Sequence, residues 1–151
     1  MSDKITMRGF IKAINTATGE IVFEKHNNIV QIGLNELAKM VGGQTGSVPQ
    51  YCAVGTSNAA TTLADTALKG TELARKAFDS VSVSDGAVNY VTTFGPGVGT
   101  GVWEETGMFS AASEGIMWSR ALTGTYTKGE NDEIKVFWTY LFKDAVLSTG
   151  E

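Results

Sequence analysis

Two alternating runs joined by the dipeptide Asp85-Gly86 are the feature that most restricts the fold of this chain. In the first run valines alternate with serines, and in the second run apolar and polar side chains also alternate. Asp-Gly is a preferred pair for a two-residue type I′ turn, in which both residues need a positive φ. Residues 75–84 and 87–95 are therefore predicted to form an antiparallel β-hairpin.

Alternating runs of the same kind recur along the chain. We predict strands at residues 5–14, 20–26, 48–55, 75–84, 87–95, 102–109, 116–122 and 132–143. Glycine-ended polar loops join the first two strands and the pair at 102–109 and 116–122, which predicts two further hairpins. About seven or eight short strands with turn signals between them indicate a mainly β fold, an antiparallel β-sandwich or barrel-like sheet.

The last predicted strand, residues 132–143, is apolar on one face and half apolar on the other. Phe137 and Leu141 supply the apolar part of that second face. A strand with two apolar faces belongs inside a sheet or against a partner chain. Phe137 and Leu141 are therefore candidate interface residues.

One helix is predicted, at residues 33–41. Its apolar residues recur at helical spacing, at Leu34, Leu37, Ala38 and Val41. A diglycine follows and ends the pattern. We expect this apolar stripe to cover one face or one end of the sheet.

Residues 56–70 form a low-complexity stretch of mostly small and polar side chains. A long loop in a compact domain is usually functional, or an arm that packs on something else. Both options stay open; because the segment lacks the apolar content to pack on its own core, a neighbouring subunit could order it. Its leucines, Leu63 and Leu68, are candidate interface residues. Residues 1–151 otherwise form one domain, with a flexible tail expected at 145–151.

The tryptophans Trp103, Trp118 and Trp138 lie in three different predicted strands. Tryptophans in strands are more often core or interface anchors than platforms for a sugar or a nucleobase. We take Trp103 and Trp118 as candidate interface residues. Glycan stacking remains the alternative, and it requires indole rings that are exposed in a groove.

The sequence contains no arrangement of reactive side chains that supports catalysis. The single histidine, His26, and the single cysteine, Cys52, share no sequence signature, and Cys52 is expected to be a small buried side chain. Adjacent Glu104 and Glu105 point to opposite faces of a strand, so they cannot share one site as acid and base. We expect one to be exposed and paired with Lys or Arg, and the other to lie at an edge or interface. The sequence therefore predicts a protein that is not an enzyme.

The glycine-rich segment at 95–101 is the nearest approach to a cofactor motif. It does not match a phosphate-binding loop, because no lysine follows it and the next predicted element is a strand. We interpret it as a turn-like connection between strands. The acidic residues form no EF-hand pattern, and a single histidine excludes a His-based zinc site on one chain. We expect neither a metal nor a cofactor.

Charge and hydropathy exclude two classes of partner. The net charge is −4 and the isoelectric point is about 5.0, and the basic residues are scattered, so we expect no binding to nucleic acid or to anionic membranes. No stretch approaches the length of a membrane span, and the N-terminal residues carry no secretory signal. The protein is expected to be made in the cytoplasm.

Several spaced blocks resemble a family of small virion structural proteins of tailed bacteriophages. The blocks are YCAVGT at 51–56, DTAL at 65–68, TELARKA at 71–77, ETGMF at 105–109, GIMWSR at 115–120 and VFWTYLF at 136–142. Together they cover most of residues 30–142, in the same order as in the family. Members of this family are often labelled tail fibre or tail-associated proteins.

The resemblance implies a structural component of a phage virion that works by protein–protein assembly, either at the tail or fibre or as a capsid decoration. It implies phage structural proteins as partners, a homo-oligomer as the form of the protein, and the virion as its location. It transfers no catalytic residues. The alternative is a carbohydrate- or receptor-binding β-module of a phage tail, with a host surface glycan as its partner.

Overall fold

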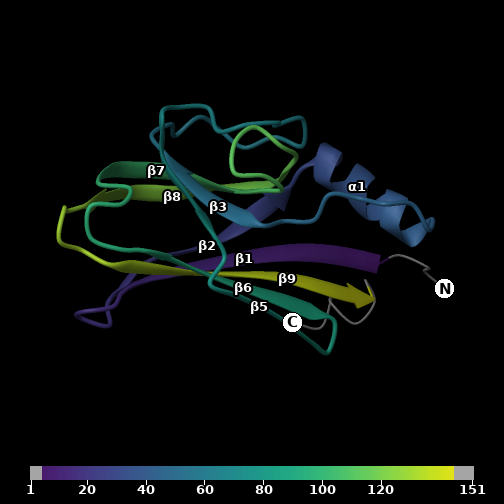
Figure 1. Cartoon of the computed structure of the whole chain (residues 1–151), viewed down its shortest axis with the longest axis horizontal. Coiled ribbons are helices and arrows are strands. Elements are labelled where there is room, and N and C mark those ends of the chain that lie inside the picture. Colours follow the sequence, from purple (N-terminus) through teal and green to yellow (C-terminus); the bar gives the residue numbers. More distant parts are fainter. Residues whose placement is uncertain (1–4, 145–151) are drawn as a thin grey trace.

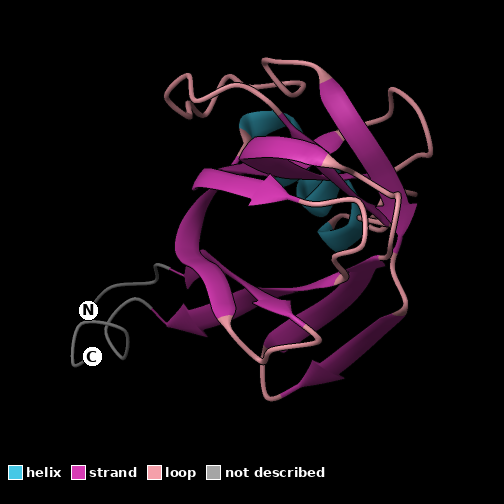
Figure 2. Ribbon diagram, turned by 90° about the vertical axis from the view of Figure 1, so that its left-hand side faces the viewer, coloured by secondary structure: helices cyan, strands magenta, loops and turns pink. Residues whose placement is uncertain are grey.

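The computed structural model describes residues 5–144, which form one antiparallel sheet curled into a half-barrel, with a single helix (Figures 1 and 2). The strands are β1 (Ile5–Asn15), β2 (Ile21–Ile29), β3 (Tyr51–Gly55), β4 (Glu72–Ala77), β5 (Ser80–Ser84), β6 (Ala87–Phe94), β7 (Gly101–Phe109), β8 (Met117–Lys128) and β9 (Ile134–Asp144). The helix is α1 (Gln31–Val41). The predicted class is confirmed: the fold is mainly β, barrel-like and carries one short helix. The tail predicted at 145–151 lies outside the described residues.

The nine strands follow the spatial order β4-β3-β7-β8-β2-β1-β9-β6-β5. In Figure 1, β3, β7 and β8 form an upper layer, while β1, β9, β6 and β5 form a lower one. The two layers join where β2 pairs with β8 over only Asn28 and Ile29. The two edge strands, β4 and β5, are separated in the chain by only Phe78 and Asp79. Since such a short link must connect the opposite edges of the sheet, those edges lie close together and the sheet curls.

The hairpin predicted around Asp85-Gly86 is confirmed. Asp85 has a φ of 48° and Gly86 a φ of 77°, as a type I′ turn requires, and Ser84 pairs with Ala87 across the turn. The prediction of one strand over 75–84 is wrong in one respect. The chain breaks at Phe78 and Asp79 and changes from one edge of the sheet to the other.

The last strand lies inside the sheet, as its two-faced pattern predicts. β9 pairs with β1 along its whole length and with β6 on its other side. Its inward face carries a continuous buried row, Ile134, Val136, Trp138 and Tyr140. Those side chains form the centre of the main core together with inward residues of β1, β6, β7 and β8.

The helix is where the sequence predicts it, although it begins two positions earlier and presents a different face. Leu34, Leu37 and Met40 pack against the core, whereas Ala38 is exposed and Val41 is 82% exposed. The rotation follows from Gly33, because a Cβ added there would lie 2.8 Å from the Trp118 Cα. The helix therefore lies against the backbone of β8 through a position that only glycine fits. The predicted stripe is right at Leu34 and Leu37 and wrong at Ala38 and Val41.

Candidate functional site

The two candidate tryptophans lie in the core. Trp103 is fully buried and its indole N–H donates to the Gly99 carbonyl at 2.7 Å. Trp118 is 3% exposed, donates to the Ser47 carbonyl at 2.7 Å, and stacks on Tyr140 with ring centroids 6.3 Å apart. Of the two predicted roles for these tryptophans, the described chain shows the core role. The exposed indoles that a glycan platform needs are not present at positions 103 and 118.

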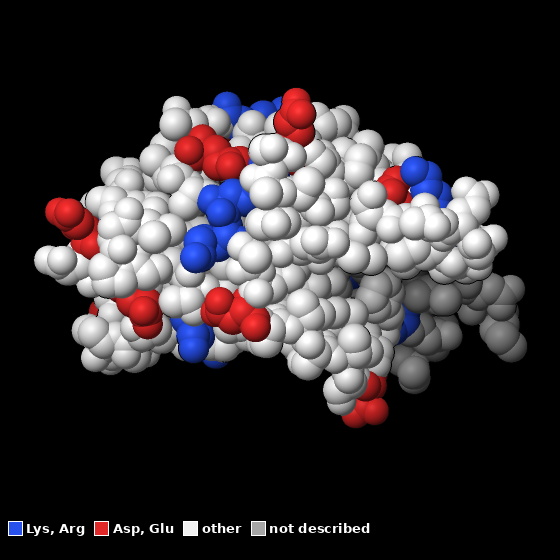
Figure 3. All heavy atoms as spheres, in the orientation of Figure 1, with Lys and Arg blue, Asp and Glu red and all other residues white. Residues whose placement is uncertain are grey.

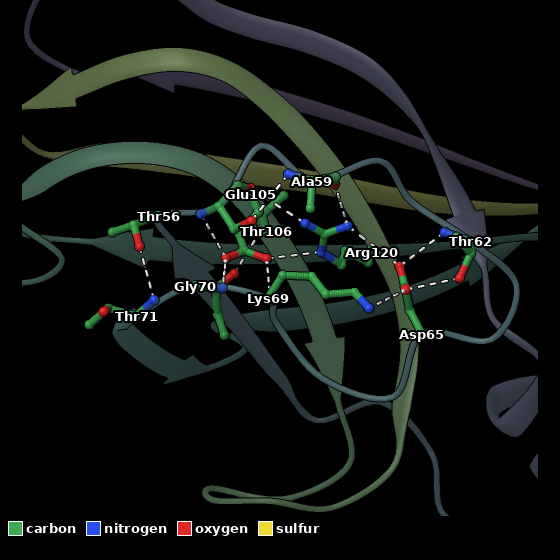
Figure 4. Close-up of polar contacts among 12 residues, drawn as sticks. Thr56, Ala59, Thr62, Asp65, Lys69, Gly70, Thr71, Glu105, Thr106 and Arg120 are labelled. Atoms are coloured by element: carbon green, nitrogen blue, oxygen red, sulfur yellow. Dashed lines mark hydrogen bonds and ion pairs between the residues drawn. The ribbon is translucent and has the colours of Figure 1, made fainter.

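The segment 56–70 is held by contacts within its own chain, whereas the sequence suggested that a neighbouring subunit could order it. It runs above the upper strands (Figure 1), and Figure 4 shows its residues in contact with Glu105 and Arg120. Leu68 packs against a small second core on that surface, made by Val30, Ala53, Phe109 and Met117. Leu63 is 60% exposed. The sequence prediction misjudged the segment because polar contacts, rather than apolar ones, hold it.

Glu105 is the centre of those polar contacts. It is fully buried on β7 and accepts hydrogen bonds from the backbone N–H groups of Ser57, Lys69 and Gly70, at 2.8–2.9 Å. The Arg120 Nε donates to the same carboxylate at 2.9 Å. Both oxygens of Glu105 are therefore occupied, and the two ends of the 56–70 segment are fastened to one side chain.

Arg120 and Asp65 complete this buried ion network. Arg120 on β8 is fully buried and also donates to the Ala59 carbonyl at 2.9 Å. Its Nη1 lies 3.5 Å from the Asp65 carboxylate, which in turn accepts the backbone N–H and the hydroxyl of Thr62. Lys69 Nζ lies 3.3 Å from Asp65. The cations and anions are mutually neutralised, as charges removed from water must be.

Burial would raise the pKa of Glu105, yet the pKa lies below its ordinary value. The backbone N–H groups of Lys69 and Ser57, then Arg120 and Gly70, outweigh the desolvation by stabilising the charged form. The pKa of Asp65 is lowered in the same way, because the bonds from Thr62 and Lys69 outweigh its burial. Both groups are therefore held as carboxylates and act as structural anions.

Among the described residues, by contrast, Glu104 accepts a hydrogen bond from the Thr125 hydroxyl, at 2.9 Å. The expectation for the Glu104-Glu105 pair is thus corrected. The glutamate paired with an arginine is the buried one, and the pair lies beneath a loop instead of at an edge. Cys52 is buried as expected, and burial raises the pKa of its thiol to about 12.

The outer face of the lower layer carries an open groove of about 580 Å³. Phe137 lines it, and Leu141 is half-buried on the same face of β9. The Phe10 ring forms the other apolar wall and lies 5.0 Å from the His26 ring. Ile11 and Ile14 add to the apolar lining, and the other polar residues of the lining are Lys12, Glu24, Lys25, Asn89 and Thr139. Sequence reasoning identified Phe137 and Leu141 but missed Phe10 and His26, although the alternation of β1 places Phe10 on the face opposite its buried side chains.

A second pocket, of about 470 Å³, opens on the inner side of the half-barrel between α1 and the β5–β6 hairpin. Its lining is almost wholly apolar: Leu37, Met40, Val48, Pro49, Val81, Val88, Tyr90, Trp118, Tyr140 and Phe142. Val81 is 52% exposed at the rim, and neighbouring Val83 is 75% exposed. The sequence signal for this site is β5 itself, in which valine alternates with serine and no residue is charged.

Comparison with known proteins adds no relative. The chain matches no model of a known protein family, no curated protein and no solved structure. Within residues 5–144 no group of His, Cys, Asp and Glu side chains is arranged to hold a metal ion. The described helix is too short to cross a bilayer.

Proposed function

We propose that this chain is a structural component of a tailed-phage virion that works by assembling with other protein chains, as a tail- or fibre-associated protein or a capsid decoration. The observation that carries the proposal is the outer groove between Phe10 and Phe137. The upper layer has its outer surface covered by the 56–70 segment, whereas on the lower layer the half-buried rings of Phe10 and Phe137 line an open groove. A groove with apolar walls and a few polar groups is what a binding site needs.

The charge distribution supports a protein partner. On the face shown in Figure 3, acidic and basic side chains form small separate groups, with a broad uncharged area between them. The groove itself is lined by charges of both signs, Lys12, Lys25 and Glu24, which favours a protein partner with mixed charges over a strongly anionic one. The phage assignment itself rests on the sequence blocks that resemble virion proteins.

Particle assembly tests the proposal. Phe137→Lys places a charge in the groove, while Val102→Lys places one on a side chain that is 43% exposed and outside the groove. Particles of the phage that encodes the chain are assembled with each variant, and the chain is quantified after gradient purification. We expect Val102→Lys to be incorporated like the wild type and Phe137→Lys to be lost. Equal incorporation of both variants would remove the groove from the assembly interface.

Glycan binding is the second candidate, and the same groove favours it. The rings of Phe10 and His26 lie beside the polar side chains of Glu24 and Asn89, and aromatic rings with polar neighbours are what a sugar-binding groove needs. A glycan array distinguishes the two functions. Binding that is lost in Phe10→Ala would support the glycan function, and an array without signal would leave protein assembly as the proposal.

A further inference from the structure

The two edges of the sheet are protected to very different degrees. Edge strand β4 carries Glu72, Arg75 and Lys76. The Arg75 guanidinium is also tied to the loop after β7, through the carbonyls of Ala111 and Glu114 at 2.9 Å. Charges on a strand and contacts with a neighbouring loop are ordinary devices that keep an edge from pairing with another chain.

Edge strand β5 has none of these devices. Its five residues, Ser80–Ser84, are all exposed, and they include no charge and no proline. Within residues 5–144, no strand pairs with the outer side of β5. An uncharged, β-branched edge that is open to solvent is a template for strand addition.

The backbone groups that β5 offers can be read from its turn. In a two-residue type I′ hairpin the residues that flank the turn exchange both backbone hydrogen bonds, and here they are Ser84 and Ala87. The direction of the backbone N–H and C=O groups alternates along the strand, so those of Ser82 also point toward β6. The N–H and C=O groups of Val81 and Val83 therefore point to the free side.

The sequence of β5, Ser-Val-Ser-Val-Ser, is the same read forwards or backwards, with Ser82 at its centre. In an antiparallel pair of two copies related by a two-fold axis at Ser82, Val81 of each copy lies opposite Val83 of the other. Those are the residues with free backbone groups, so each opposed pair exchanges both hydrogen bonds. All valines then lie on the pocket side of the sheet, and all serines lie on the outer side.

We infer that β5 is a self-association edge, and that its occupant is β5 of a second copy of this chain, antiparallel and centred on Ser82. The self-complementary pattern is what selects a second copy over another partner. The dimer is isologous, and it joins two half-barrels through one continuous sheet. It also packs the exposed side chains of Val81 and Val83 against their counterparts, at the rim of the inner pocket.

Two aspartates oppose the pairing, and their charges make the strength of the dimer depend on salt. The same register places Asp79 of one copy opposite Asp85 of the other, just beyond the two ends of the paired strands. Like charges directly opposite each other weaken a pair of strands. We therefore expect added salt to tighten the dimer, and Asp85→Asn to do the same, because asparagine keeps the preferred turn chemistry without the charge.

Sedimentation velocity over a concentration series tests the association. We expect a monomer–dimer equilibrium for the wild type and for the control Ser82→Thr. In Ser82→Lys two ammonium groups meet at the axis, and the dimer should weaken by about tenfold or more. A wild type that stays monomeric at high micromolar concentration, or a Ser82→Lys variant that dimerises as tightly as Ser82→Thr, would overturn the inference.

Cysteine cross-linking tests the register. Side chains opposite each other across a pair of strands come within disulfide range, so Ser82→Cys should form a covalent dimer with itself on mild oxidation. Ser80→Cys and Ser84→Cys should each stay monomeric alone and cross-link when mixed. The native Cys52 is buried and does not interfere. Cross-linking of Ser80→Cys with itself as efficient as that of Ser82→Cys would refute the register.

The inference deepens the proposed function, and its biological role rests on that function, but the two fail separately. A chain that enters virions without cross-linking at Ser82 would overturn the self-association edge and leave the proposed function standing. A Ser82→Cys chain that cross-links, in a protein that is absent from virions, would overturn the proposed function and leave the self-association edge standing.

Discussion

Replacing Glu105 by glutamine is the sharpest probe of the buried ion network, because the shape of the side chain is kept while its charge and one acceptor are lost. Glutamine has a single acceptor oxygen, so its amino group must face N–H donors that Glu105 now satisfies. Arg120 also loses its closest anion while remaining fully buried. Removing one partner from a buried ion pair costs about 3–5 kcal/mol.

For a chain of this size that loss corresponds to a melting temperature lower by roughly 6–20 °C. Glu104→Gln is the matched control, since it is the same substitution one residue away, on a side chain whose hydrogen bond within residues 5–144 is to the Thr125 hydroxyl. We expect the control to change the free energy of unfolding by less than about 0.5 kcal/mol. Urea unfolding followed by tryptophan fluorescence measures both variants.

Hydrogen exchange locates the effect. The amides of Ser57, Lys69 and Gly70 donate to Glu105, so they should exchange much faster in Glu105→Gln, while the amides of β9 should keep the exchange of the most stable part of the fold. A Glu105→Gln variant as stable as Glu104→Gln, with unchanged exchange at these three amides, would refute the claim that this carboxylate fastens the 56–70 segment.

Three further outcomes follow from buried groups. Folding lowers the pKa values of Glu105 and Asp65, so the two carboxylates stabilise the native state at any pH above their ordinary pKa values of about 4. This stabilisation is lost as the pH falls through the lowered pKa values. Between neutral and acidic pH, the free energy of unfolding should therefore fall more in the wild type than in Glu105→Gln. The Cys52 thiol, with a pKa raised to about 12, should not react with a thiol-specific dye at pH 8 until urea unfolds the chain, and rapid reaction in buffer would contradict its burial. The indole N–H of Trp138 has no hydrogen-bond partner among the described residues, whereas that of Trp103 has one. Trp138→Phe should therefore destabilise the fold less than Trp103→Phe. The reverse order of stabilities in urea unfolding would contradict this difference in hydrogen bonding.

Local patterns predicted the elements well, because each element is determined by nearby residues. The Asp85-Gly86 turn needs only the two dihedral angles that those residues favour, and β9 needs only its own alternation. The same patterns could not predict that β4 and β5 lie at opposite edges. No glycine, proline or turn dipeptide marks the break at Phe78 and Asp79, and only the closure of the curled sheet shows that the chain changes edge there.

The ion network was beyond sequence reasoning for a different reason. Arg120 reaches Glu105 because β7 and β8 pair in a particular register, and Asp65 joins them only after the loop folds over both strands. Nothing near Asp65 in the sequence points to Arg120. Low apolar content therefore suggested an arm that needs another subunit, whereas a buried carboxylate with several backbone donors holds the segment in place.

The tryptophans show a similar limit. A tryptophan in a strand predicts an anchor, but whether the anchor lies in the core or at an interface depends on which face the sheet closes upon. The half-barrel closes over Trp103 and Trp118 and leaves Phe10 and Phe137 outside. The proposed binding surface therefore lies on the outer face of β1 and β9, and the tryptophans belong to the core.

The central claim is that this chain works as a repeated part of a larger protein assembly. Quantitative mass spectrometry of gradient-purified particles, from the phage that encodes the chain, tests it most directly. We predict the chain in fixed ratio to the major structural proteins, at several copies per particle and as an even number if every copy pairs through β5. Particles that are complete and infectious yet contain no copies of the chain would contradict the account.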